Sequence, residues 1–139
     1  MNRRAAILTG SALILTLAGG NAAGSEDDFL YNVRNFEAAL KAWQHRDGEI
    51  SWRVSDFFCD YLISRPVEFL SLAEKNRAPL RDWITNLPKR SLKDFGGCVD
   101  VERRRQCMVR SLLNVQPQPG SLGAELLKVL ESAKAAGVD

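Results

Sequence analysis

Residues 49–63, EISWRVSDFFCDYLI, form the stretch that decides the fold of this chain. Bulky apolar residues recur in it at helical spacing and make one wide stripe, while Trp52, Cys59 and Ile63 lie on the opposite side of the same helix. The stripe consists of Ile50, Val54, Phe57, Phe58, Tyr61 and Leu62. A helix that is apolar on both sides is usually packed between neighbours, so we expect this segment at the centre of a helical core.

A second helical pattern precedes this stretch. Residues 29–43 follow Ser25, a plausible N-cap, and the acids at 26–28, which suit a helix start. Their apolar residues share one face and are Phe29, Val33, Phe36, Leu40 and Trp43. The pattern predicts an amphipathic helix that ends near Gly48.

Further helices are predicted after the central stretch. Pro66 and Pro79 each indicate a helix start, because proline at the first helical position sacrifices no hydrogen bond, and Pro88 is expected to end the second of these helices. Asp100 caps a long helix over residues 100–115, and Ser121 caps a last one that ends near Gly137. In the helix after Asp100, one face carries the apolar residues Val101, Met108, Leu112 and Val115.

The predicted fold is therefore all-α, since no sustained alternation of apolar and polar residues indicates a strand. We expect a single domain over residues 25–139, either a compact bundle or a short irregular solenoid of about five to six helices. Residues 50–115, with short helices joined by tight Pro or Asn turns, resemble HEAT or armadillo-type repeats. That resemblance implies a protein-binding surface.

The first residues predict export. Arg3 and Arg4 precede an apolar run over residues 5–18 and small residues over 19–24, the layout of a cleavable signal peptide over residues 1–24. Gly20 stands where a lipoprotein signal requires cysteine, so no lipid anchor is expected. The predicted product is periplasmic or secreted and has no stable membrane anchor.

Charge is unevenly distributed along the exported part. Residues 25–64 hold four basic and eight acidic side chains, whereas residues 65–115 hold 11 basic and six acidic ones. Over residues 25–139, 17 basic and 17 acidic side chains balance, and such a dipolar but neutral product is not expected to bind nucleic acid. In the basic part, Arg103 and Arg110 are seven residues apart and share a helix face. The basic stretch, which includes Arg103, Arg104, Arg105 and Arg110, is either a solvated helix face or a docking surface for an acidic partner.

Three cysteines remain after processing: Cys59, Cys98 and Cys107. An oxidising compartment favours one disulfide and one remaining thiol. If both were helical, Cys98 and Cys107 would lie on the order of 13 Å apart, beyond the roughly 7 Å that a bridge permits. Bridges from Cys59 to Cys98 or Cys107 are together slightly favoured, although Gly96-Gly97 leaves the local pair open.

No recognisable chemistry is encoded in the sequence. His45, the single histidine, falls in a polar run and is expected at a surface turn. The cysteines and His45 lack the compact spacing of a zinc site, so no catalytic, metal or cofactor site is predicted. Trp43 and Trp83 are expected in the core, whereas Trp52, on the opposite side of its helix, becomes a binding anchor if it is exposed.

These patterns favour an exported helical protein that binds another protein and is not an enzyme. In size, export and helical content, the chain is similar to small bacterial immunity proteins, which implies a toxin or another exported factor as the partner. The alternative is a small enzyme or a ligand-binding periplasmic protein with a site assembled from scattered residues. The candidate partner-binding residues are Arg103, Arg110 and Trp52.

Overall fold

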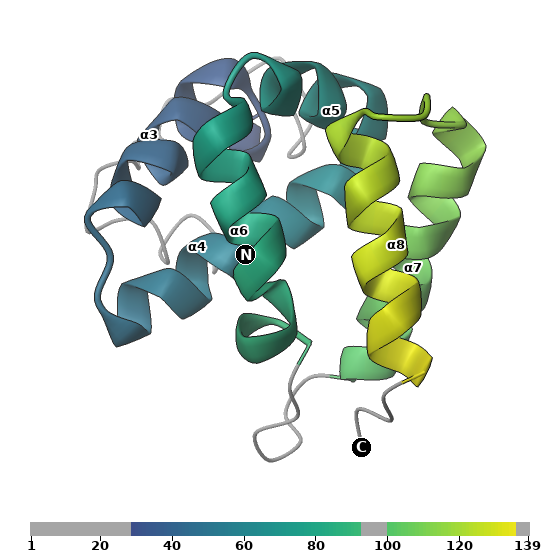
Figure 1. Ribbon diagram of the computed structural model, residues 1–139. Coiled ribbons are helices and arrows are strands. Elements are labelled where there is room, and N and C mark those ends of the chain that lie inside the picture. The colour runs from purple at the N-terminus through teal and green to yellow at the C-terminus, as the bar shows by residue number, and fades with distance from the viewer. Residues whose placement is uncertain (1–28, 93–99, 136–139) are drawn as a thin grey trace. The chain divides into compact units, whose positions relative to one another are not determined.

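The computed structural model describes residues 29–92 and 100–135 and is all-helical over these ranges (Figure 1). Their helices are α3 (Val33–Gln44), α4 (Gly48–Ser64), α5 (Pro66–Glu74), α6 (Arg77–Arg90), α7 (Val101–Val115) and α8 (Leu122–Ala135). No strand occurs in these ranges, which confirms the predicted all-α class. None of the described helices is long and apolar enough to cross a membrane. The predicted signal segment, the predicted cap at residues 25–28, Cys98 and Gly137 lie outside the described residues.

The chain divides into two compact units, Met1–Phe58 and Cys59–Asp139, with the boundary inside α4. In the first unit, α3 starts at Val33, later than the sequence pattern predicts. Asn32 causes the difference, because its side chain accepts a hydrogen bond from the Asn35 backbone N–H at 2.9 Å and donates one to the Phe29 carbonyl at 3.1 Å. An Asn that bonds its neighbouring backbone favours a cap over a helix interior. Val33, predicted on the buried stripe, is therefore exposed at the first helical position.

The core of the first unit is aromatic. Phe36 of α3 lies 5.4 Å from Phe58 of α4 between ring centroids, and Tyr31 lies 5.7 Å from Phe57. These tilted pairs are a favourable geometry for aromatic rings. Trp43 is buried as predicted, and the Arg46 guanidinium stacks over its ring at 3.9 Å.

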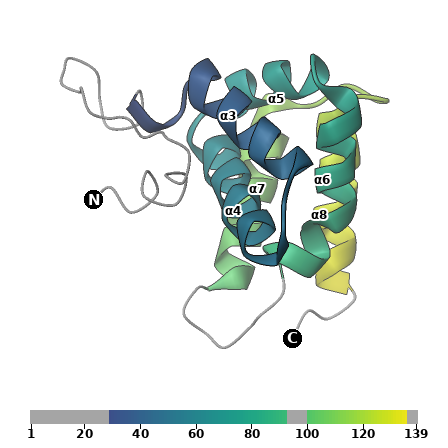
Figure 2. The ribbon, with the colours of Figure 1, turned by 90° about the vertical axis from the view of Figure 1, so that its left-hand side faces the viewer.

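The second unit contains the end of α4 and the helices α5 to α8. Phe69 of α5 contacts both Tyr61 and Trp83, with ring centroids 5.8 Å apart in each pair. Helix α8 packs against α5, α6 and α7, and its most extensive contact is with α6 (Figures 1 and 2). Helices α5 to α8 thus pack around one another within this unit.

Three of the four helix starts in the second unit lie where the sequence predicts them, because α5 begins at Pro66 and both Asp100 and Ser121 cap their helices. The Asp100 carboxylate accepts from the Arg103 N–H at 3.0 Å, and the Ser121 hydroxyl accepts from the Ala124 N–H at 3.2 Å. Helix α6, in contrast, begins at Arg77, two residues before Pro79. Proline is tolerated there because the first-turn N–H groups have no partner within the helix.

The predicted helix end at Pro88 is wrong, because α6 continues to Arg90 with Pro88 inside it. A proline removes one ladder hydrogen bond and crowds the preceding turn. Here the chain leaves the helix within one turn, and the N–H groups of Ser91 and Leu92 both bond the Leu87 carbonyl, at 3.1 and 3.3 Å.

A cluster of ion pairs joins α5, α6 and α8. The Glu74 carboxylate accepts from the Leu122 backbone N–H at 2.7 Å and so supports the start of α8 from another helix. It also pairs with Arg77. Arg81 of α6 donates two hydrogen bonds to Glu125 of α8, at 3.1 and 2.8 Å. These bonds lower the pKa of both carboxyls, for Glu74 chiefly through the Leu122 N–H and for Glu125 chiefly through Arg81.

Candidate functional site

Arg103 and Arg110 are both exposed on α7. Seven residues of helix separate them, which corresponds to about 10 Å along the axis and nearly the same angular position. Neither guanidinium forms an ion pair with an acidic side chain of the described residues. The two cations are therefore available to an external partner.

Arg105, in contrast, does not belong to that surface. Only 5% of it is exposed, because it shares the buried face of α7 with Met108 and Leu112. Its guanidinium donates to both carboxylate oxygens of Glu102, at 2.9 and 2.6 Å, and to the Leu130 carbonyl of α8 at 3.3 Å. The Glu102 hydrogen bonds raise the pKa of Arg105 above its usual value. The expectation of one solvated basic face is thus wrong for this residue, which helps to hold α7 against α8.

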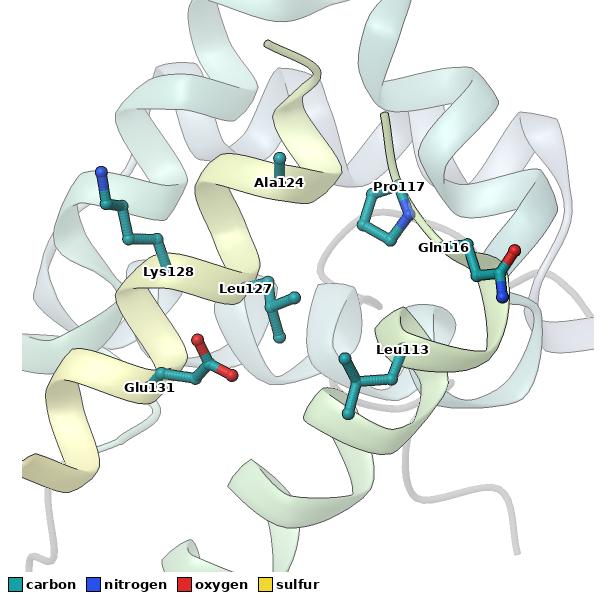
Figure 3. Close-up of a pocket in the computed structure, with 7 residues that line it drawn as sticks. All are labelled: Leu113, Gln116, Pro117, Ala124, Leu127, Lys128 and Glu131. Carbon is teal, nitrogen blue, oxygen red and sulfur yellow. The ribbon is translucent and has the colours of Figure 1, made fainter. Parts of the chain in front are cut away.

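A groove of about 660 Å³ lies between α7 and α8 (Figure 3). Leu113 of α7 and Leu127 of α8 both point toward the gap between the two helices, and Pro117 stands at one end. The lining residues are Leu113, Gln116, Pro117, Ala124, Leu127, Lys128 and Glu131. Leu113 is 53% exposed, so the groove has an apolar wall that is open to solvent.

Sequence reasoning missed this groove. Leu113 directly follows Leu112, which is fully buried, and one residue of helix turns the side chain by about 100°. That offset was a signal that Leu113 leaves the buried stripe. The α8 side of the groove could not be predicted from the sequence, because the packing of α7 against α8 is a tertiary contact.

Trp52 is 39% exposed on α4, whereas Trp43 and Trp83 are buried. The exposure meets the condition under which Trp52 was expected to act as a binding anchor. Trp52 belongs to the first unit, and Arg103 and Arg110 belong to the second. Each of the two sets of candidate residues is therefore described within its own unit.

The described residues contain no disulfide. Cys59 is fully buried within α4, Cys107 is half-buried on α7, and both are in the thiol form. The Cys59–Cys107 pair considered from the sequence is thus not formed. Cys98, the third candidate, lies outside the described ranges.

His45 is exposed at the end of α3, in the turn predicted for it. Across residues 29–92 and 100–135, no three His, Cys, Asp or Glu side chains gather in a way that could hold a metal ion. The candidate site in the second unit therefore consists of Arg103, Arg110 and the groove between α7 and α8. Comparisons of the chain with protein-family models, with curated proteins and with solved structures found no match.

Proposed function

We propose that this chain is an exported helical protein that acts by binding another protein. The observation that carries the proposal is the placement of Arg103 and Arg110 on one outward face of α7, each without an ion-pair partner among the described residues. Exposed, uncompensated charges of one sign attract a partner of the opposite sign and accelerate its association. The exposed Leu113, one turn after Arg110, adds apolar area to the same helix.

The predicted signal segment supports a periplasmic or secreted location, and the small size and helical content support a role like that of immunity proteins. In that role the partner is a toxin whose action the protein suppresses. The resemblance to helical repeats also remains a prediction and agrees with a binding role. No observation on the described residues specifically favours the alternative of an enzyme or ligand carrier.

The test reverses both arginines to Glu and compares partner recovery from periplasmic or culture extract. Arg103→Glu/Arg110→Glu should weaken binding of the partner by roughly tenfold or more and reduce its salt dependence, because rim charges act mainly on the association rate. Circular dichroism and a urea titration should show that folding is intact, since exposed charges usually contribute less than about 1 kcal/mol.

A matched control is available on α3. Arg34 and Lys41 are also exposed, also basic and also seven residues apart. The variant Arg34→Glu/Lys41→Glu changes net charge by the same amount on a different helix and should leave recovery unchanged. Equal recovery by the wild type and the α7 variant would show that the basic face is only solvated surface, and the proposal would then be rejected.

A further inference from the structure

The groove between α7 and α8 has the shape of a helix-binding site. The two helices lie side by side and run in opposite directions, joined at one end by the turn that contains Pro117 (Figure 1). On α8 the lining runs from Ala124 to Glu131, about 10 Å or two helical turns. The surface between two packed helices accepts a third helix in the same way that helices pack in bundles.

The walls of the groove are mainly apolar, and one carboxylate faces into it. Leu113 and Leu127 point toward the gap between the two helices (Figure 3). The Glu131 carboxylate points toward the same gap, one turn of α8 beyond Leu127, whereas Lys128 points away from it. The charge that faces the groove is therefore negative.

Glu131 is free to meet a cation from outside the chain. It is exposed, and it forms neither a hydrogen bond nor an ion pair with the side chains that the structure describes. Arg105 acts on Glu131 only through space, because its guanidinium is bonded to both carboxylate oxygens of Glu102. A cation that enters the groove therefore finds a carboxylate with no bonded partner among the described residues.

The spacing of these groups defines the chemistry of an occupant. Glu131 follows Leu127 by four residues, which corresponds to about 6 Å along α8. An occupant that covers the leucines reaches the carboxylate if its cation lies one helical turn from its apolar contact, as residues four apart on a helix do. A polybasic occupant is disfavoured, because Arg110 is exposed one turn before Leu113 on α7.

Other modes of peptide recognition fit less well. Addition of a strand needs an exposed sheet edge, and residues 29–92 and 100–135 contain no strand. Recognition of proline-rich peptides relies on grooves lined by aromatic rings, and no aromatic side chain lines this one. A helix that lays its apolar face into an aliphatic groove uses the two leucines that are present here.

We propose that this groove docks an apolar helix face of the protein partner that carries a single basic side chain. The apolar face covers Leu113 and Leu127, and the Lys or Arg one turn away pairs with Glu131. This inference rests on the proposed function, because it specifies which part of the partner is bound. A pair of opposite polarity to those of Arg103 and Arg110 also fixes the orientation in which the partner docks.

The experiment uses three synthetic, hydrocarbon-stapled helices of about five turns with the same leucine stripe and otherwise neutral side chains. They differ at one position, four residues after the central leucine, which is Lys, Gln or Glu. Binding to the full exported chain is followed by fluorescence anisotropy. The Lys peptide should bind best and the Glu peptide worst, with roughly fivefold between them, because attraction by Glu131 is replaced by repulsion. No binding by any of the three, or any other order of affinity, would overturn the inference.

A charge exchange at Glu131 tests the ion pair itself. Glu131→Lys should reverse the order, so that the Glu peptide binds best and the Lys peptide worst. Glu37→Lys makes the same change in net charge at an exposed acid of α3 that does not line the groove, and it should leave the order unchanged. An unchanged order in the Glu131 variant, or the same effect of both variants, would refute the contact with Glu131.

Two further variants separate the apolar contact from general stickiness. Leu113→Gln should weaken binding of the Lys peptide by roughly five- to tenfold, the change expected when one apolar anchor is lost. Val67→Gln removes an apolar side chain that is 69% exposed on α5 and does not line the groove, and it should have no effect. An equal loss with both variants would refute a groove-specific contact.

Two additional readouts distinguish this inference from the proposed function. If the peptides fail to bind while partner recovery from extract still depends on Arg103 and Arg110, the groove inference is wrong and the proposed function stands. If light scattering shows a dimer that Leu113→Gln dissociates, a second copy of the chain occupies the groove, and the inference is also overturned. If neither peptides nor arginine-dependent partners bind, both proposals are wrong.

Discussion

Replacement of Arg105 by Met should destabilise the protein, whereas the same change at the neighbouring Arg103 should not. Methionine preserves most of the aliphatic stem of Arg105, so the loss is confined to its polar contacts. These are the paired hydrogen bonds to Glu102 and the longer one to the Leu130 carbonyl. Arg103 has an exposed side chain, for which a substitution usually changes stability by less than about 0.5 kcal/mol.

The size of the stability loss in Arg105→Met depends on how exposed Glu102 is once Arg105 is removed. Removing one partner of a fully buried ion pair costs about 3–5 kcal/mol, because the remaining charge has no water. The Glu102 side chain is 49% exposed and is hydrated once Arg105 is gone. A loss of about 1.5 kcal/mol is therefore expected, near the lower end for a hydrogen bond to a charged group.

The assay is equilibrium urea unfolding followed by circular dichroism. With a slope of about 1.5 kcal/mol per molar urea, Arg105→Met should lower the midpoint by roughly 1 M. Both substitutions remove one positive charge from the first half of α7, so the helix dipole affects them similarly. Equal midpoints for the two variants would refute the structural role of Arg105. If the midpoints differ as expected, a double-mutant cycle of Arg105→Met with Glu102→Gln should show a coupling free energy, and the cycle of Arg103→Met with Glu102→Gln should show none.

Two further predictions concern the start of α8. The Leu122 N–H lowers the pKa of Glu74, so the charged carboxylate stabilises the fold above the ordinary carboxyl pKa of 4.5, and this stabilisation is lost as the pH falls through the lower folded pKa. Glu74→Gln should lower the free energy of unfolding by about 0.5 kcal/mol at pH 7, a small value because Glu74 is partly exposed. The difference between the variant and the wild type should vanish near pH 2. A difference that persists in acid would contradict this assignment. Gly123→Ala should destabilise by about 1–3 kcal/mol, because the added Cβ would lie 2.9 Å from the Pro117 Cβ; a raised melting temperature, the usual result of Gly→Ala in a helix, would show that the turn yields.

The all-helical class was predictable because local apolar spacing determines it. On α7, the spacing of Met108 and Leu112 predicted both the helix and its buried face, and the structure buries both residues. The same spacing contained the signal for Arg105, which lies three residues before Met108 and seven before Leu112. Residue type alone predicts that Arg105 is exposed, which is wrong, because three consecutive arginines point in three directions around a helix.

Helix ends and the groove were less predictable, for different physical reasons. Asn32 and Pro88 act through local backbone bonding, which competes with apolar spacing, and the start of α3 and the end of α6 were accordingly misplaced. The groove depends on tertiary packing between α7 and α8, which no local pattern encodes. The support that Glu74 gives to α8 is equally nonlocal, because 48 positions separate it from Leu122.

A partner that binds the outward surface of α7 needs both the charges of Arg103 and Arg110 and apolar contact with Leu113. Full burial of a leucine side chain stabilises by about 1.5–3 kcal/mol, and Leu113 is already about half covered, so a partner gains about 1 kcal/mol from it. Association costs at least about 4 kcal/mol in lost translational and rotational freedom. Leu113 alone therefore cannot hold a partner. Charges such as Arg110 accelerate the encounter, whereas the leucines slow dissociation. Charge reversal at Arg103 and Arg110 should consequently act on the association rate, and Leu113→Gln on the dissociation rate.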